Sequence, residues 1–199
     1  MPHFSTPPLW LLVFLQALVS AASLVVEIVA GRMLAPYVGM SLYTWTSIIA
    51  IVLAGFSLGH WLGGRFADLE QRRALALTLW SMVWAALTTA AAIWILRGLS
   101  GSVIAASDNP LTSILVLTSL AFFLPSFAAG IPAPILAQIS IQSGTQNSGS
   151  ALGAMFAASA IGAIVGTLAA GFVFISYLGT AWTMAVITLV YLLTALILF

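Results

Sequence analysis

Six long apolar runs dominate the sequence and decide what it can fold into. They cover residues 9–31, 43–64, 74–97, 111–132, 150–174 and 180–198. A helix needs about 20 apolar residues to cross the hydrocarbon core of a bilayer. Because each run is continuously apolar and does not alternate over about ten residues, helices are favoured over a β-barrel. Only 5% of the residues are charged, against roughly 25% in soluble domains, so we expect lipid as the solvent.

The connectors between the runs are too short to form separate domains. We therefore predict an all-α integral membrane protein in which residues 1–199 form one bundle of six transmembrane helices. Its orientation follows from arginine, which accumulates in cytoplasmic loops. Arg65, Arg72 and Arg73 lie in the second connector, while the first and third connectors hold only Arg32 and Arg97. The second connector and both termini are therefore predicted to be cytoplasmic.

Composition excludes several classes of function. The net charge is +1 and lysine is absent, so the clustered basic surface that nucleic-acid binding needs is not expected. Cysteine is absent as well, which excludes disulfides, thiolate metal sites and cysteine nucleophiles. No spacing typical of a catalytic serine–histidine pair, an aspartate pair or a zinc site occurs. We predict no catalytic residue, no metal and no cofactor.

Glycine recurs along one helical face in two of the runs. Small residues let helices approach closely in lipid, where there is no hydrophobic drive between them. The two faces are therefore predicted to pack tightly, with each other or with a partner protein, although ordinary packing within the chain is the simpler interpretation. Their glycines are Gly55, Gly59 and Gly63 in the second run, and Gly149, Gly153, Gly162 and Gly166 in the fifth.

Proline interrupts the fourth run. Proline lacks an amide hydrogen and disturbs the helix before it, so we expect a kink at Pro125 and a break between Gly130, Pro132 and Pro134. Two interpretations stay open: a bent helix, as is common in membranes, and a discontinuous helix that lines a cavity, as in many transporters.

Two ionisable residues lie within or beside the apolar runs. A carboxylate in the membrane is costly and normally faces a partner or water, so Glu27 either pairs with Arg32 or binds a proton or solute. His60 either hydrogen-bonds across helices or titrates near neutral pH.

The cytoplasmic connector carries a charged motif. Residues 64–73, GRFADLEQRR, resemble the loop motif of the major facilitator superfamily, in which an aspartate and arginines form a charge relay. Asp68, Arg72 and Arg73 fit that motif, and Arg65 precedes them. Leu69 and Gln71 depart from it, at positions that are usually basic and glycine. An ordinary solvated loop is the alternative.

Three longer segments suggest a specific family. VVEIVAGRMLAPYVGMSLYTWTSIIAIVLAGFSLGHWLGGRFAD, FFLPSFAAGIPAP and ALGAMFAASAIGAIVGTLAAGFVFISYLGT resemble the N-terminal membrane region of bacterial membrane-bound spermidine synthase-like proteins, over about residues 20–180. The resemblance implies half of a facilitator-type fold in the bacterial cytoplasmic (inner) membrane, crossed several times. In fused members an aminopropyltransferase domain follows. This sequence ends in an apolar run and offers four carboxylates, so we expect no enzyme activity from it.

Two functions remain open from the sequence. The first is a non-catalytic membrane subunit that anchors a separately encoded partner, either a cytosolic synthase-like protein or a membrane complex. The second is a half-size transporter that works as a homodimer, for polyamines or related small solutes. Against the second, Glu27 is the only carboxylate expected in the interior. Membership of an electron-transfer or photosynthetic assembly is neither supported nor excluded.

Overall fold

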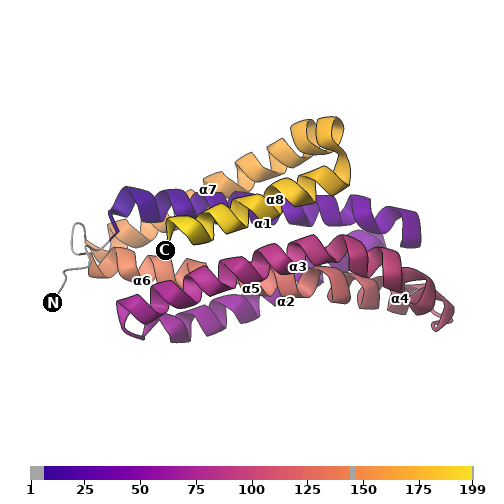
Figure 1. Cartoon of the computed structure of the whole chain (residues 1–199), viewed down its shortest axis with the longest axis horizontal. Coiled ribbons are helices and arrows are strands. Elements are labelled where there is room, and N and C mark those ends of the chain that lie inside the picture. The colour runs from indigo at the N-terminus through magenta and orange to yellow at the C-terminus, as the bar shows by residue number, and fades with distance from the viewer. Residues whose placement is uncertain (1–6, 144–146, 199) are drawn as a thin grey trace.

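The computed structural model describes residues 7–143 and 147–198, and its elements are all helical (Figure 1). Residues 1–6, 144–146 and 199, which belong to the predicted termini and fourth connector, lie outside this description. The α-helices are α1 (Leu9–Val38), α2 (Leu42–Ala67), α3 (Gln71–Ala105), α4 (Pro110–Thr118), α5 (Leu124–Gly130), α6 (Pro132–Gln142), α7 (Ser148–Ala169) and α8 (Gly179–Ile197). Two π-helical segments join them, η1 (Ser119–Phe123) and η2 (Ala170–Leu178).

Five helical stretches of the described chain are long and apolar enough to cross a membrane. This confirms the all-helical, multi-pass membrane interpretation. The first two connectors are shorter than predicted, because α1 continues to Val38 and α2 ends only at Ala67. Likewise, α3 continues to Ala105. Hydropathy falls where a helix leaves lipid, but its backbone hydrogen bonds continue into the polar region.

The last of the five stretches is 50 residues long, Ser148–Ile197. It contains a sharp reversal at Gly179, whose φ is 74° and ψ is 175°. Residues other than glycine are essentially excluded from this backbone region. Figure 1 shows α7 and α8 running in opposite directions on either side of this reversal. The start of α1, the α2–α3 turn and the end of α8 lie at the same end of the bundle.

The proline-rich fourth segment is helical from α4 to α6, and η1 ends at Phe123, two residues before Pro125. Local π adjustments and serine side chains are ways in which membrane helices satisfy backbone groups freed by proline. Beside Pro125, the hydroxyl of Ser126 donates to the carbonyl of Phe122 at 2.9 Å. A second interruption falls at Ile131, between Gly130 and Pro132, where the amide bonds to Ala128 instead of the residue four positions back. The backbone dihedrals of Ile131 stay in the helical region, and only the acceptor of its amide changes. The predicted break is therefore limited to this one residue, and Pro134 lies inside α6.

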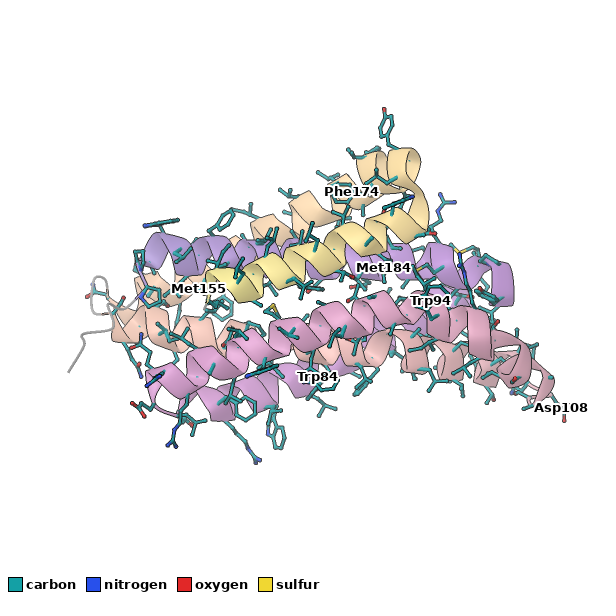
Figure 2. All side chains as sticks on the ribbon, viewed as in Figure 1. Trp84, Trp94, Asp108, Met155, Phe174 and Met184 are labelled. Carbon is teal, nitrogen blue, oxygen red and sulfur yellow. The ribbon has the colours of Figure 1, made fainter. Side chains whose placement is uncertain are left out.

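The core follows the centre of the bundle and leaves large apolar side chains outside. Leu34, Phe122 and Met184 are fully buried. Trp84 and Trp94 are 61% and 72% exposed and lie on the outer surface of α3 (Figure 2). An outer surface this apolar is suited to lipid, because exposed patches of this kind are rare on soluble monomers.

Candidate functional site

One close helix pair is formed by α2 with α5 and α6. A Cβ atom added to Gly55 would lie 2.9 Å from the carbonyl oxygen of Phe123. At Gly59 and Gly63, it would overlap the carbonyl oxygens of Phe127 and Ile131. Only glycine permits this approach, because the opposing atoms belong to the backbone and cannot rotate away. The face of α2 predicted from its four-residue spacing is therefore a packing face within the chain.

A second close pair is formed by α1 and α7. A Cβ atom at Gly162 or Gly166 would overlap the carbonyl oxygens of Ala17 and Ala21, respectively. The two glycine-rich helices thus pack against different neighbours, and the alternative that they pack on each other is wrong. Gly149 and Gly153 are exposed, with nothing within 4 Å of an added Cβ. They lie in the N-terminal part of α7, and no described neighbour approaches them as Ala17 and Ala21 approach Gly162 and Gly166.

A groove of about 730 Å³ lies between these two pairs. Its walls come from α1, α2, α5, α6 and α7, and most of its lining is apolar. Three lining residues, His60, Phe156 and Ala160, are exposed. The polar lining residues are Gln16, Ser20, Ser23, His60, Gln138 and Ser159.

The wall contributed by α1 carries a polar stripe. Gln16, Ser20, Ser23 and Glu27 fall at spacings of four, three and four residues, which places them within about 60° of one another around the helix axis. The first three line the groove, and Glu27 continues the stripe beyond it. This stripe was not predicted, although its spacing is present in the sequence.

Gln16 is the most deeply placed polar side chain of the groove. It is 5% exposed, and its Nε2 donates a hydrogen bond of 2.6 Å to Oγ of Ser159 on α7. Its Oε1 is buried without a hydrogen-bond partner among the described residues. The pair joins positions 143 residues apart, so no local pattern points to it.

Glu27 and Arg32 do not form the ion pair that was one of the predicted alternatives. Glu27 is half-buried and Arg32 is exposed. Five residues correspond to about 140° around a helix, so the two side chains leave α1 on different faces. His60 stacks on the ring of Phe56, with centroids 6.2 Å apart, and makes no hydrogen bond across helices within the described chain.

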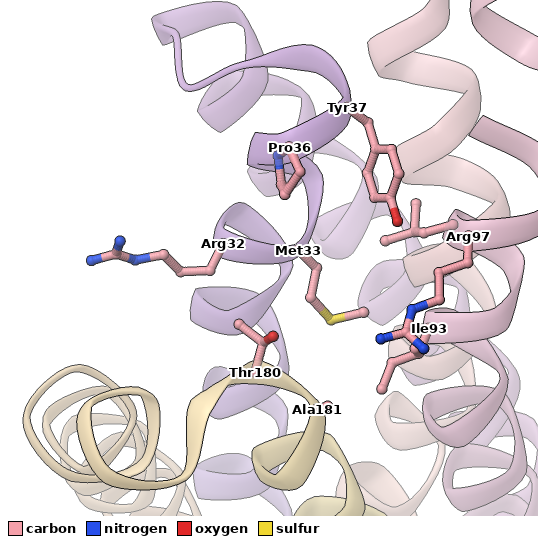
Figure 3. Close-up of a pocket in the computed structure, with 9 residues that line it drawn as sticks. Arg32, Met33, Pro36, Tyr37, Ile93, Arg97, Thr180 and Ala181 are labelled. Atoms are coloured by element: carbon pink, nitrogen blue, oxygen red, sulfur yellow. The ribbon is translucent and has the colours of Figure 1, made fainter. Parts of the chain in front are cut away.

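A smaller pocket of about 160 Å³ lies at the opposite end of the bundle, between α1, α3 and the start of α8. Arg32, Tyr37, Arg97 and Thr180 are among its lining residues. Figure 3 shows the guanidinium of Arg97 extending toward Met33, while that of Arg32 points away from the pocket. The two charges therefore do not converge on one point.

The charged α2–α3 turn lies at the end of the bundle nearer the groove. Arg65 stacks over the indole ring of Trp61 at 3.9 Å, a cation–π contact. Asp68 follows α2 as its C-cap, while Arg72 and Arg73 lie in the first turn of α3, and all three are exposed. The charge-relay hypothesis for this turn stays a prediction.

Within residues 7–143 and 147–198, no three histidine, aspartate or glutamate side chains come together where they could hold a metal ion. Comparison of the chain with protein families, with curated proteins and with solved structures finds no match. The resemblance to spermidine synthase-like membrane regions therefore stays a prediction. The groove around Gln16 is the candidate functional site.

Proposed function

We propose that this chain is one half of a solute pathway across a bacterial cytoplasmic membrane and works as a homodimer. The groove between the two close helix pairs carries the proposal. Ligand sites in helical bundles form between helices, in cavities of roughly 300–1,000 Å³ with a few polar groups. The groove, at about 730 Å³, falls in that range. No catalysis is part of the proposal.

The proposed topology has six crossings, with α7 and α8 as separate spans. The α8 helix has 19 residues, about 28 Å of length, which is close to the roughly 30 Å hydrocarbon core. Six crossings bring both termini to one side. Arg65, Arg72 and Arg73 at that end favour the cytoplasm. Half of a facilitator-type transporter, as the sequence resemblance implies, has this topology.

A second copy is proposed because the groove has polar groups and exposed lining residues. Polar side chains within the membrane normally face protein or water and not lipid. Beside the groove, α7 exposes the small residues Gly153, Ala157 and Ala160, and Ala160 itself lines the groove. Small residues allow close helix association in lipid. A two-fold contact along this face of α7 brings two grooves together.

Single-cysteine cross-linking tests the assembly cleanly, because the native chain has no cysteine. Gly153→Cys places a thiol on the exposed face of α7. Gly98→Cys is the matched control, since Gly98 is also exposed with open space around it, but on α3. In native membranes treated with a mild oxidant, we expect a disulfide-linked dimer from the Gly153 variant and monomer from the Gly98 variant. Monomer from both variants contradicts the homodimer.

The second candidate function is a non-catalytic anchor for a separately encoded partner. The observation in its favour is the exposed group of Arg65, Arg72 and Arg73 at one end of the bundle, which offers a surface to a cytosolic protein. Gentle extraction of the tagged chain, followed by mass spectrometry of its associated proteins, distinguishes the two. A different protein at fixed stoichiometry favours the anchor, and a second copy of the chain favours the pathway.

A further inference from the structure

The groove contains a hydrogen-bonding group that the protein leaves unused. Gln16 is 5% exposed, its Nε2 donates to Ser159, and its Oε1 has no partner among the described residues. Buried polar atoms are almost always hydrogen-bonded, and an unpaired one calls for an explanation. Reversing the amide would pair Oε1 with the serine hydroxyl and leave the NH₂ group unpaired instead. In either orientation, one polar atom of Gln16, a residue that lines the groove, therefore has no hydrogen-bond partner among the described residues.

The rest of the lining limits what can occupy the groove. None of the described lining side chains is an aspartate, glutamate, lysine or arginine. A charged solute would lose its hydration there without a partner of opposite charge, which is strongly unfavourable. The titratable lining residue is His60, and it is exposed. A polyamine, which carries several positive charges, therefore does not suit this lining.

The apolar part of the lining defines the remaining surface of the solute. Val19, Phe56, Leu152 and Met155 are among the side chains that form it. A molecule that fills this space must be largely apolar, with its hydrogen-bonding group directed at α1. An acyl chain would satisfy the apolar walls, but it would leave Gln16 unpaired.

We infer that the groove binds an uncharged, largely apolar solute with a hydroxyl or N–H group that donates a hydrogen bond to Oε1 of Gln16. This inference rests on the proposed function, because it specifies the class of solute for the pathway. Gln16 is then the residue that selects such a solute over an apolar molecule of the same shape. Nε2 of Gln16 is already paired with Ser159, which leaves Oε1 as the atom for the solute.

The test uses the full chain in lipid nanodiscs and a matched pair of probes, 2-naphthol and naphthalene. Ala163, which lines the groove, is replaced by cysteine, and the rate of its reaction with a fluorescent maleimide is measured with each probe at equal membrane concentration. Gly98→Cys reports any effect of the probes on the bilayer alone. We expect 2-naphthol to protect the Ala163 position about fivefold better than naphthalene, the effect of a single hydrogen bond.

Three further variants separate the role of Gln16 from folding. With Gln16→Leu added to Ala163→Cys, the two probes should protect the cysteine from the maleimide equally. Ser159→Ala keeps Oε1 and should retain the preference for 2-naphthol. Thr89→Val removes the other buried side-chain oxygen without a partner among the described residues; Thr89 is not part of the groove lining, so this variant should also retain the preference. Equal protection by both probes in the unmodified background, or no protection by either, overturns the inference.

These outcomes are independent of the test of the proposed function. Protection is measured on a single binding site and requires neither a dimer nor transport. Cross-linking at Gly153 without a preference for 2-naphthol refutes the solute class and leaves the assembly standing. A preference for 2-naphthol without cross-linking does the reverse.

Discussion

The close contact between α2 and α5 predicts a large difference between two neighbouring glycine substitutions. In Gly59→Ala, the new methyl group overlaps the carbonyl oxygen of Phe127 and lies 3.1 Å from Cα of Gly130. Both are backbone atoms, so the helices must separate. In Gly64→Ala, nothing lies within 4 Å of the new methyl group. Both substitutions gain about 0.5–1 kcal/mol of helix stability, and this gain cancels in the comparison.

The difference between the two variants therefore isolates the cost of the contact. Inserting a methyl group into a well-packed interior costs about 1–3 kcal/mol, and we expect Gly59→Ala to be less stable than Gly64→Ala by that amount. Equilibrium unfolding in mixed detergent micelles, with increasing sodium dodecyl sulfate and tryptophan fluorescence as the signal, measures it. The seven native tryptophans provide the signal. Equal unfolding midpoints for the two variants would refute the packing argument.

Three further substitutions test the turn, a helix cap and the core. Gly179→Ala should lower the free energy of unfolding by about 1–3 kcal/mol, because φ at Gly179 is 74°. Gly101→Ala is the control, since Gly101 is helical with open space around it. Equal unfolding midpoints for the two variants contradict this prediction. Ser41→Ala removes the acceptor for the amide of Thr44 at 3.1 Å and should cost about 1 kcal/mol, seen as faster amide hydrogen exchange at the start of α2. Tyr191→Phe should lower the free energy of unfolding by about 0.5–1.5 kcal/mol, the value of one hydrogen bond. The Ser23 hydroxyl already donates to Val19, so it accepts the bond from Tyr191. A double-mutant cycle with Ser23→Ala that shows no coupling contradicts this.

The helices were predictable because twenty consecutive apolar residues leave the backbone few choices. In lipid, each polar backbone group must be satisfied within its own segment, and a helix does this. The ends of the helices were less predictable. The segment from Arg32 to Val38 contains Arg32 and Pro36 and was assigned to a connector, but it continues α1. Pro36 lies near the end of α1, and it removes one backbone hydrogen bond, the one that its missing amide hydrogen would make to the residue four positions earlier.

The glycine faces were predictable, but their neighbours were not. A four-residue spacing identifies which side of a helix is small, and any helix with a compatible surface can occupy it. Gly59 contacts α5, while Gly162 contacts α1. Gly153 has the same spacing in the sequence and contacts nothing within the described chain. Spacing therefore indicates that a close contact is possible, and the tertiary arrangement decides whether it forms.

The groove was the least predictable feature because its walls come from distant parts of the sequence. As the one carboxylate in an apolar run, Glu27 was the predicted polar site, yet the side chain with the unpaired polar atom is Gln16. An uncharged amide in an apolar run is a weak signal by itself. Its spacing to Ser20, Ser23 and Glu27 was the available indication, and its bond to Ser159 required the fold.

Accessibility of the groove from the two sides of the membrane tests the proposed pathway most directly. The Ala163→Cys variant is labelled with a membrane-impermeant maleimide in vesicles of each orientation. Leu87→Cys, at an exposed position within the third apolar run, is the reference for lipid-facing positions. We expect labelling at Ala163 from both sides, because a pathway must open to each side in turn. Labelling from one side only, at every probe concentration and temperature, would contradict a pathway and leave the chain a static membrane subunit.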